Sequence, residues 1–226
     1  RIVNGMKDLG VNVSYNSETG YYKAFMNVKP CGDYTFVKSS HTGTELMILL
    51  SVFCKDTVTI HNTALEPEID DLISFLNEGG AKIRRNGNDI VIEGVKSLIQ
   101  KKPHTIVSDR NEATTFAVLG IITKGDVTVC PIPENYLKTF INVIEKIKGG
   151  TEKIGENSWR FFYKGPLISL DIVTAPHPGF MTDWQPNWAV LMTQAAGKSL
   201  IHERVFENRF SYVDELIKMG AKIEYS

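Results

Sequence analysis

The sequence is poor in the features that mark metal sites and membrane segments. It has three cysteines among 226 residues, at positions 31, 54 and 130, without Cys-x-x-Cys or Cys/His spacing. His177 and His202 also lack a partner at ligand spacing, so we expect no metal. The thiols are expected to be buried in a reducing cytosol. The longest apolar run, residues 46–54, is too short to cross a bilayer, so no membrane partner is expected.

Charge of one sign is also lacking. The chain has 25 Lys and Arg against 26 Asp and Glu, a formal charge of −1 without long single-sign runs. This balance argues against a nucleic-acid or membrane-surface partner. Motifs for dinucleotides, a Walker A loop, a nucleophile elbow and zinc are missing, which predicts no cofactor. An initiator Met and a signal sequence are missing too, and we expect a chain cut from something longer.

What the sequence does contain is a repeat. Gly10, Gly80, Gly150 and Gly220 recur at intervals of about 70 residues, inside similar short phrases such as Gly-Ala-Lys-Ile. A constant interval of this kind indicates a supersecondary unit that is used several times. The length allows one large domain or two small ones.

Each unit shows the same succession of patterns. Amphipathic stretches at 69–76, 137–147 and 213–217 precede three of the glycines, which predicts helices capped by Gly at positive φ and then a strand. More uniformly apolar helices are expected upstream, at 43–53, 112–123 and 183–196. Asn86-Gly87-Asn88 predicts a hairpin between two strands. The unit is therefore strand, buried helix, strand, amphipathic helix and two strands, an α/β class protein with mixed sheets.

The units differ most where the buried helices begin, so candidate chemistry is sought there. Lys38 with Ser40 and Thr42 precedes the first helix, beside Ser39 and His41. Free N–H groups, a cation and hydroxyl donors suit a phosphorylated ligand. Ser and Thr are also ordinary helix caps, and a lone Lys is usually solvated. Spacing alone favours this capping interpretation over a phosphate site.

The other two helix starts carry acids. Asp109 and Arg110, with Glu112, could form an ion-paired cap or the charged wall of a cleft, and the residue types favour the cap. Asp183 follows the stiff run 176–180, which would place its carboxylate on a fixed loop as a general base. An N-cap role for Asp183 explains the position equally well.

Two amphipathic helices also begin with notable residues. Glu66, Pro67 and Glu68 are explained by helix initiation, with Pro in the first turn and acids at the positive end of the helix. Arg209 lies in an apolar-flanked helix start, which suggests anion binding or a buried ion pair.

At these positions the chain resembles the enolpyruvyl transferase family, on its sugar-nucleotide branch. The similarity is carried by ordered phrases that span nearly the whole chain. They are His-Thr-Gly-Thr-Glu at 41–45, Glu-Pro-Glu-Ile-Asp-Asp-Leu at 66–72, Asp-Arg-Asn-Glu-Ala-Thr-Thr-Phe at 109–116, residues 176–185, and Phe-Glu-Asn-Arg-Phe at 206–210.

The resemblance implies a fold and a domain organisation. The family has two domains, each an inside-out α/β barrel of three βαβαββ units with the buried helices at its centre and a cleft between the domains. On this basis residues 1–107 are expected to form part of the domain that bears the mobile active-site loop. Residues 108–226 are expected to form part of the second domain.

The resemblance also implies a reaction, in which the enolpyruvyl group of phosphoenolpyruvate moves to the 3-hydroxyl of UDP-N-acetylglucosamine for peptidoglycan synthesis in the cytoplasm. Asp183 matches the family's base, and Phe206 and Arg209 match residues near the reacting centre. The matches for substrate binding complete the expected site. They are Asp183 and Val205 for the sugar nucleotide, Lys38, Ser40, His41 and Thr42 for the nucleotide cradle, Glu66 and Glu68 for the cleft lining, and Asp109 and Arg110 for the cleft wall.

Other functional parts of the family lie outside these residues, including the loop cysteine that supplies a proton and the arginines that hold phosphoenolpyruvate. We therefore expect the rest of the enzyme chain as a partner and no activity from this segment alone. Two alternatives stay open. One is the sister family that acts on shikimate 3-phosphate, and the other is a non-catalytic scaffold or binding protein. The oligomeric state is not predicted.

Overall fold

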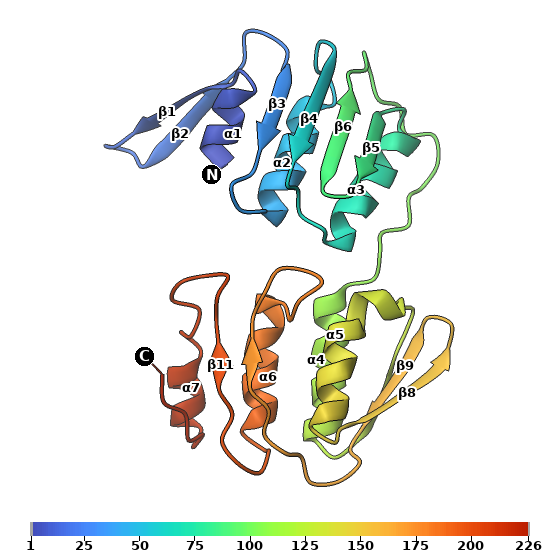
Figure 1. The fold of residues 1–226 in the computed structure, drawn as a ribbon, viewed down its shortest axis with the longest axis vertical. Coiled ribbons are helices and arrows are strands. Elements are labelled where there is room, and N and C mark those ends of the chain that lie inside the picture. The colour runs from blue at the N-terminus through green and yellow to red at the C-terminus, as the bar shows by residue number, and fades with distance from the viewer. Residues whose placement is uncertain (1, 226) are drawn as a thin grey trace. The chain divides into compact units, whose positions relative to one another are not determined.

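The computed structural model describes residues 2–225, which divide between Val107 and Ser108 into two compact units. Each unit is described by itself, following the colour gradient of Figure 1 from blue to red. No helix within residues 2–225 combines the length and the apolar character that crossing a membrane requires.

The first unit contains one complete copy of the predicted repeat. Its elements are α1 (Ile2–Asp8), β1 (Asn12–Asn16), β2 (Tyr21–Phe25), β3 (Gly32–Thr35), α2 (His41–Ser51), β4 (Thr57–His61), α3 (Pro67–Glu78), β5 (Lys82–Asn86) and β6 (Asp89–Glu93). From β3 to β6 the order is strand, helix, strand, helix and two strands, as predicted. The sheet order is β3-β4-β6-β5, and only β3 and β4 are parallel, so the sheet is mixed.

The core of the first unit lies between this sheet and helices α2 and α3, which Figure 1 shows together on one side of it. Met47 and Ile48 of α2 and Ile69 of α3 are fully buried there. The hairpin between β5 and β6 is confirmed: Asn86 pairs with Asp89, and Gly87 takes a φ of 61° in the two-residue turn.

The second unit repeats the pattern with variations. Its elements are α4 (Arg110–Ile122), β7 (Asp126–Val129), α5 (Glu134–Lys146), β8 (Gly150–Gly155), β9 (Ser158–Phe162), β10 (Ile172–Val173), the 3-10 turn η1 (Thr182–Trp184), α6 (Gln185–Met192), β11 (Ile201–His202) and α7 (Val213–Lys218). Strands β7, β9 and β8 form an antiparallel sheet, whereas β10 and β11 are parallel. The α/β class is confirmed, and no sheet closes into a barrel within residues 2–225.

The apolar helices α2 and α4 were expected to be buried, and within the described residues their burial is only partial. Leu49 of α2 is 50% exposed, and Phe116 and Leu119 of α4 are 49% and 48% exposed. The elements of each helix's own unit cover one face only, because sheet and neighbouring helices lie on that face (Figure 1). Each helix therefore keeps an uncovered apolar stripe in the described residues.

The expected helix cap by a glycine at positive φ is found at three of the four repeated glycines. Gly10, Gly80 and Gly220 have φ between 91° and 100°, but the equivalent cap after α5 is Lys148, at 65°. The amide of Lys148 bonds to the Glu145 carbonyl as the Gly80 amide bonds to that of Asn77, so the cap lies two residues before Gly150.

Gly150 serves close packing instead, since a Cβ there would lie 2.6 Å from the Phe162 ring and carbonyl. The strand expected after Gly220 is not formed within residues 221–225.

Two further expectations are corrected. The third apolar helix was expected over 183–196, but α6 ends at Met192, Thr193 and Gln194 form a turn, and Ala196 forms an isolated bridge with Ile168. Of the three cysteines, only Cys54 is buried; Cys31 and Cys130 are exposed. Both exposed thiols lie in loops outside the two cores, where no apolar contact requires burial.

Candidate active site

The start of α2 uses its hydroxyls for capping. The side chain of Ser40 accepts a hydrogen bond from the Gly43 amide at 3.2 Å, so it is the N-cap. The ring of His41 lies 3.5 Å from the Glu45 carboxylate, one helical turn away. Lys38 and Thr42 are exposed beside this cap. The local structure agrees with the capping interpretation of Ser40, and the nucleotide cradle stays a prediction.

The start of α3 agrees with helix initiation. Glu66 is the N-cap, with Pro67 in the first turn and Glu68 following. The Glu66 carbonyl accepts from the Ile69 amide at 3.0 Å. Glu66 is nonetheless only 8% exposed, which is unusual for an acid and marks it as more than a solvated surface residue.

At the start of α4 the two charged residues have separate roles. Asp109 caps the helix, because its Oδ1 accepts from the amides of Asn111 and Glu112 at 2.7 and 3.1 Å. Arg110 is 1% exposed, and its Nη1 lies 3.1 Å from Nδ1 of His177 and 2.8 Å from the Met181 sulfur. The buried Arg110 side chain therefore supports the loop before Asp183 through His177 and Met181. This partner of His177 was missed, because 67 residues separate the two in sequence.

Asp183 lies on the 3-10 turn that precedes α6. The turn is anchored by Trp184, which is 1% exposed and packs its ring edgewise on Phe180 and Phe140. The Asp183 side chain is 44% exposed. It is not the N-cap of either the turn or α6, so the capping interpretation is wrong. Apolar packing thus fixes the turn, while the Asp183 carboxylate stays accessible to solvent. A carboxylate in this position could accept a proton from a bound ligand.

Arg209 joins Asp183 from the loop after β11. Its Nη2 donates a hydrogen bond to Oδ1 of Asp183, and its guanidinium carbon lies 5.3 Å from the centre of the Phe206 ring. The Arg209 side chain is 35% exposed, so the pair lies at the surface of the unit and not in its core. The structure thereby brings together three of the predicted site residues in the second unit.

Glu203 completes this group and was not predicted. Its Oε1 accepts from the amides of Val205 and Phe206, and its Oε2 accepts from the Thr182 hydroxyl. Although partial burial opposes its charge, these bonds lower the pKa of its carboxyl below the usual value. The only sequence signal for Glu203 is an acid a few residues before the Phe206–Arg209 phrase.

Tyr212 borders the same group. Its hydroxyl donates to the Gln185 side chain at 2.8 Å. Burial, with the nearby Glu203 charge, raises the pKa of Tyr212 to about 12. Tyr212 is therefore a neutral hydrogen-bond donor at physiological pH.

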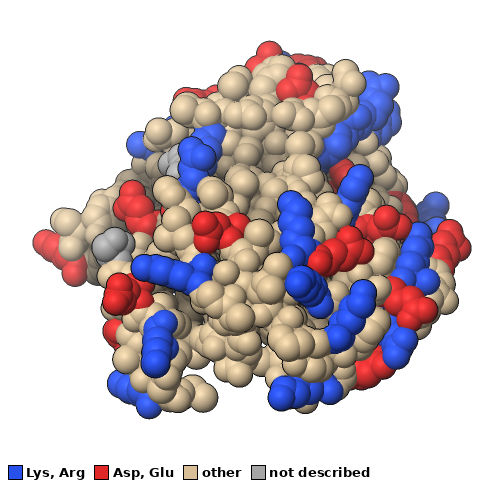
Figure 2. Space-filling model, turned by 60° about the horizontal axis from the view of Figure 1, so that its bottom comes forward, with Lys and Arg blue, Asp and Glu red and all other residues tan. Residues whose placement is uncertain are grey.

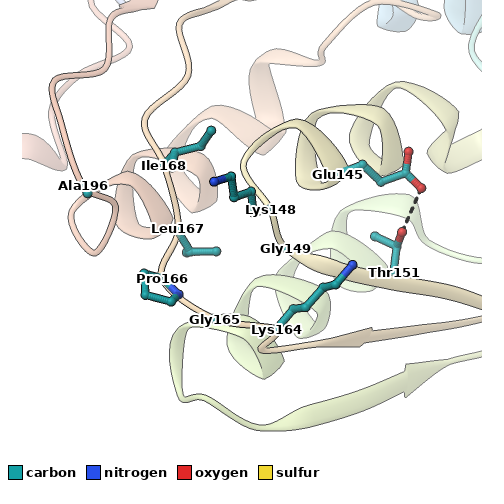
Figure 3. Close-up of a pocket in the computed structure, with 10 residues that line it drawn as sticks. All are labelled: Glu145, Lys148, Gly149, Thr151, Lys164, Gly165, Pro166, Leu167, Ile168 and Ala196. Carbon is teal, nitrogen blue, oxygen red and sulfur yellow. Dashed lines mark hydrogen bonds between the residues drawn. The ribbon is translucent and has the colours of Figure 1, made fainter.

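A cavity of about 700 Å³ in the second unit contains none of the predicted site residues. Figure 3 shows its lining, in which Glu145 bonds to Thr151 and the exposed Lys148 and Lys164 provide the cations. The lining residue Ala196 follows the C-terminal end of α6, whereas Asp183 precedes its N-terminal end. The groove is thus separate from the Asp183 group.

A smaller cavity of about 240 Å³ lies beside the Asp183 turn and includes His177, Pro178 and Trp184. Figure 2 shows Lys and Arg interspersed with Asp and Glu over the face in view. This pattern agrees with the formal charge of −1.

The βαβαββ order of the first unit is the one that the resemblance to the enolpyruvyl transferase class implied. A family model confirms this: residues 1–226 match EPSP synthase (3-phosphoshikimate 1-carboxyvinyltransferase). The chain belongs to the EPSP synthase family.

Individual relatives are similar over nearly all of this chain. The UDP-N-acetylglucosamine 1-carboxyvinyltransferase of Acidobacterium capsulatum is 36% identical over 223 residues, which are 98% of this chain and 50% of the relative. The enzyme of the same name from Chlamydia pneumoniae is 39% identical over 223 residues, 97% of this chain and 48% of the relative. The chain spans about half the length of the curated relatives it matches.

Solved structures support the fold. The enolpyruvyl transferase NikO from Streptomyces tendae has a TM-score of 0.84 at 19% identity, over 96% of this chain and 54% of that one. An EPSP synthase from Acinetobacter baumannii has a TM-score of 0.63 at 16% identity, over 96% of this chain and 52% of that one. At these identities the similarity concerns the fold alone.

Proposed function

We propose that the protein transfers the enolpyruvyl group of phosphoenolpyruvate to the 3-hydroxyl of UDP-N-acetylglucosamine, a cytoplasmic step of peptidoglycan synthesis. One observation carries the proposal: Asp183 and Arg209 pair on an anchored turn, in a chain whose relatives at 36% and 39% identity are named for this acceptor. The activity is proposed for the whole enzyme, of which these residues contribute a part.

Asp183 is assigned the role of base. It removes the proton of the 3-hydroxyl as that oxygen forms a bond to C2 of phosphoenolpyruvate, while C3 accepts a proton from an acid outside these residues. The tetrahedral adduct then loses phosphate and a proton from C3, which restores the carbon–carbon double bond. A carboxylate is a weak base for an alcohol, so the two proton transfers must be coupled.

Arg209 orients this base. Because its guanidinium holds Oδ1 of Asp183, the second carboxylate oxygen is the one available to accept the hydroxyl proton. The Phe206 ring is 55% exposed beside the guanidinium and offers an apolar surface to the sugar. Val205 is assigned a contact with the same substrate, from the loop position next to Phe206.

The nucleotide is assigned to the start of α2, where Lys38, His41 and Thr42 lie at the positive end of the helix. Ser40 contributes through its cap and not through a free hydroxyl. Glu66 and Glu68 at the start of α3 and Asp109 at the start of α4 are assigned to the lining of the substrate site. Arg110 is assigned a supporting role beneath the loop 176–181, because it is 1% exposed.

The two units are proposed to be parts of two inside-out barrels, each built from three βαβαββ units in the whole enzyme. The uncovered apolar stripes of α2 and α4 support this proposal. Leu49 and Phe116 are about half exposed in the described residues, and a further unit in each barrel would bury them.

Phosphate release distinguishes the proposed function from its alternatives. The longest natural form of the protein is incubated with phosphoenolpyruvate and either UDP-N-acetylglucosamine or shikimate 3-phosphate. We expect release with the sugar nucleotide only. Release with shikimate 3-phosphate alone would assign the protein to the activity that names its family model. Binding of the sugar nucleotide without release in the intact enzyme would favour the scaffold alternative.

A further inference from the structure

Glu203 occupies a special place in the second unit, at the carboxyl end of β11. Its neighbour across the strand pair is Thr174, which follows β10 and is 1% exposed. The Thr174 hydroxyl accepts from the Arg204 amide at 2.9 Å and also bonds to the Glu203 carboxylate. Ligand sites in α/β proteins lie at the carboxyl ends of parallel strands, which is where this carboxylate is fixed.

The two oxygens of Glu203 hold two different segments. Oε1 accepts from the amides of Val205 and Phe206 at 2.7 and 3.1 Å, and so shapes the loop that continues to Arg209. Oε2 accepts from the Thr182 hydroxyl at 2.8 Å, on the residue before Asp183. One partly buried side chain therefore connects the turn and the loop. In each of these bonds an oxygen of the Glu203 carboxylate is the acceptor.

We propose that Glu203 is a positioning residue, which ties the turn that carries Asp183 to the loop that carries Arg209. The inference rests on the proposed function and adds a residue to its site. Glu203 does not touch the reacting atoms; it sets the distance at which the base and its arginine meet. A misplacement of about 1 Å in such a pair costs about 100-fold in rate.

A matched set of variants tests this role in the longest natural form of the protein. E203Q keeps the shape but replaces one acceptor oxygen by a donor, and T182V removes the hydroxyl on the turn. D171N is the control. The Asp171 carboxylate accepts from the Leu200 amide at 2.7 Å, across the amino ends of the same two strands. It thus makes the same acid-to-amide change at a similar bond, away from Asp183.

We expect E203Q to lower kcat/KM about 100-fold, and D171N to leave it unchanged within about threefold. T182V should lower kcat/KM too, and the double variant should be no worse than E203Q, because both changes break one connection. E203D, which keeps both acceptor oxygens on a shorter stem, should recover part of the loss. All rates are compared at a temperature where thermal unfolding shows every variant folded.

Hydrogen exchange provides a readout that does not depend on activity. E203Q should accelerate exchange at the Val205 and Phe206 amides and also in the turn 182–184. Acceleration at Val205 and Phe206 without acceleration in the turn 182–184 would contradict the proposal that Glu203 connects the two segments. Active wild type with normal kcat/KM in E203Q, or additive losses in the double variant, would overturn this inference alone. A wild type that releases no phosphate with either acceptor overturns the proposed function, and this role with it.

Discussion

Arg209 donates a hydrogen bond to Asp183 across 26 residues of sequence, from the loop after β11 to the turn before α6. The pair is about one third to one half exposed, so it is accessible to a ligand. An exposed ion pair contributes little to stability, about 0–1 kcal/mol. We therefore propose that this ligand-accessible pair serves function and not folding.

Replacing Asp183 by Asn in the whole enzyme should lower kcat by about 10²- to 10⁴-fold, because the amide cannot accept the hydroxyl proton. The free energy of unfolding should change by less than about 1 kcal/mol. Phosphate release and thermal unfolding check the two statements. D126N, which weakens the surface pair of Asp126 with Arg160, is the control and should keep its turnover. Near-normal turnover in D183N would exclude Asp183 as the base.

Replacing Arg110 by Met should destabilise the second unit by about 1–3 kcal/mol, because the part-buried Nδ1 of His177 loses the hydrogen bond from this buried guanidinium. Met approximates the length of the side chain and so limits cavity formation. Urea unfolding of the protein measures the difference. R84M is the matched control, since the Arg84 side chain is 74% exposed in its pair with Glu93, and should cost less than about 0.5 kcal/mol. Equal costs for the two variants would contradict a structural role for Arg110.

His104 predicts a pH dependence in the first unit. Its Nε2 lies 3.0 Å from the Asp71 carboxylate and its Nδ1 3.3 Å from that of Glu78, so both ring nitrogens donate when the ring is charged. The Asp71 hydrogen bond is the main cause that raises the pKa of His104. A raised folded-state pKa means that the stabilisation is fully present below the unfolded pKa of about 6.5 and is lost as pH rises through the folded value.

Unfolding of the wild type and of H104N between pH 5.5 and 9 checks this prediction. The wild-type advantage should be largest at the acidic end and shrink toward the alkaline end. In a D71N/E78Q background the advantage should no longer vary in this way, because the two carboxylates are gone. A pH-independent difference between wild type and H104N would refute the prediction.

The three thiols should react at different rates with an aromatic disulfide reagent. Cys31 and Cys130 are exposed and should react in the native protein. Cys54 is 2% exposed, and burial is the main cause that raises the pKa of its thiol, so it should react only after unfolding. Peptide mapping of the labelled protein should find two of these three thiols modified before denaturant and all three after it. C54A should leave the native count at two, and a native count of three would contradict the burial.

Much of the local structure was predictable from the chain. The period of 70 residues located the helix ends near Gly10, Gly80 and Gly220, because only a residue that tolerates positive φ suits that cap. The same rule failed at Gly150, where Lys148 takes the left-handed conformation. Sequence could not show this, since Gly150 is retained for close packing against Phe162.

The sequence by itself determined the α/β units, the hairpins and the phrases that carry the family resemblance, because these depend on periodicity and turn chemistry within short stretches. Only the tertiary structure decided that Arg110 is buried under His177, that Arg209 reaches Asp183, and that Glu203 connects their two segments. The reason is physical. Such pairs form between residues far apart in sequence, and which of them meet depends on how strands and helices pack into one core.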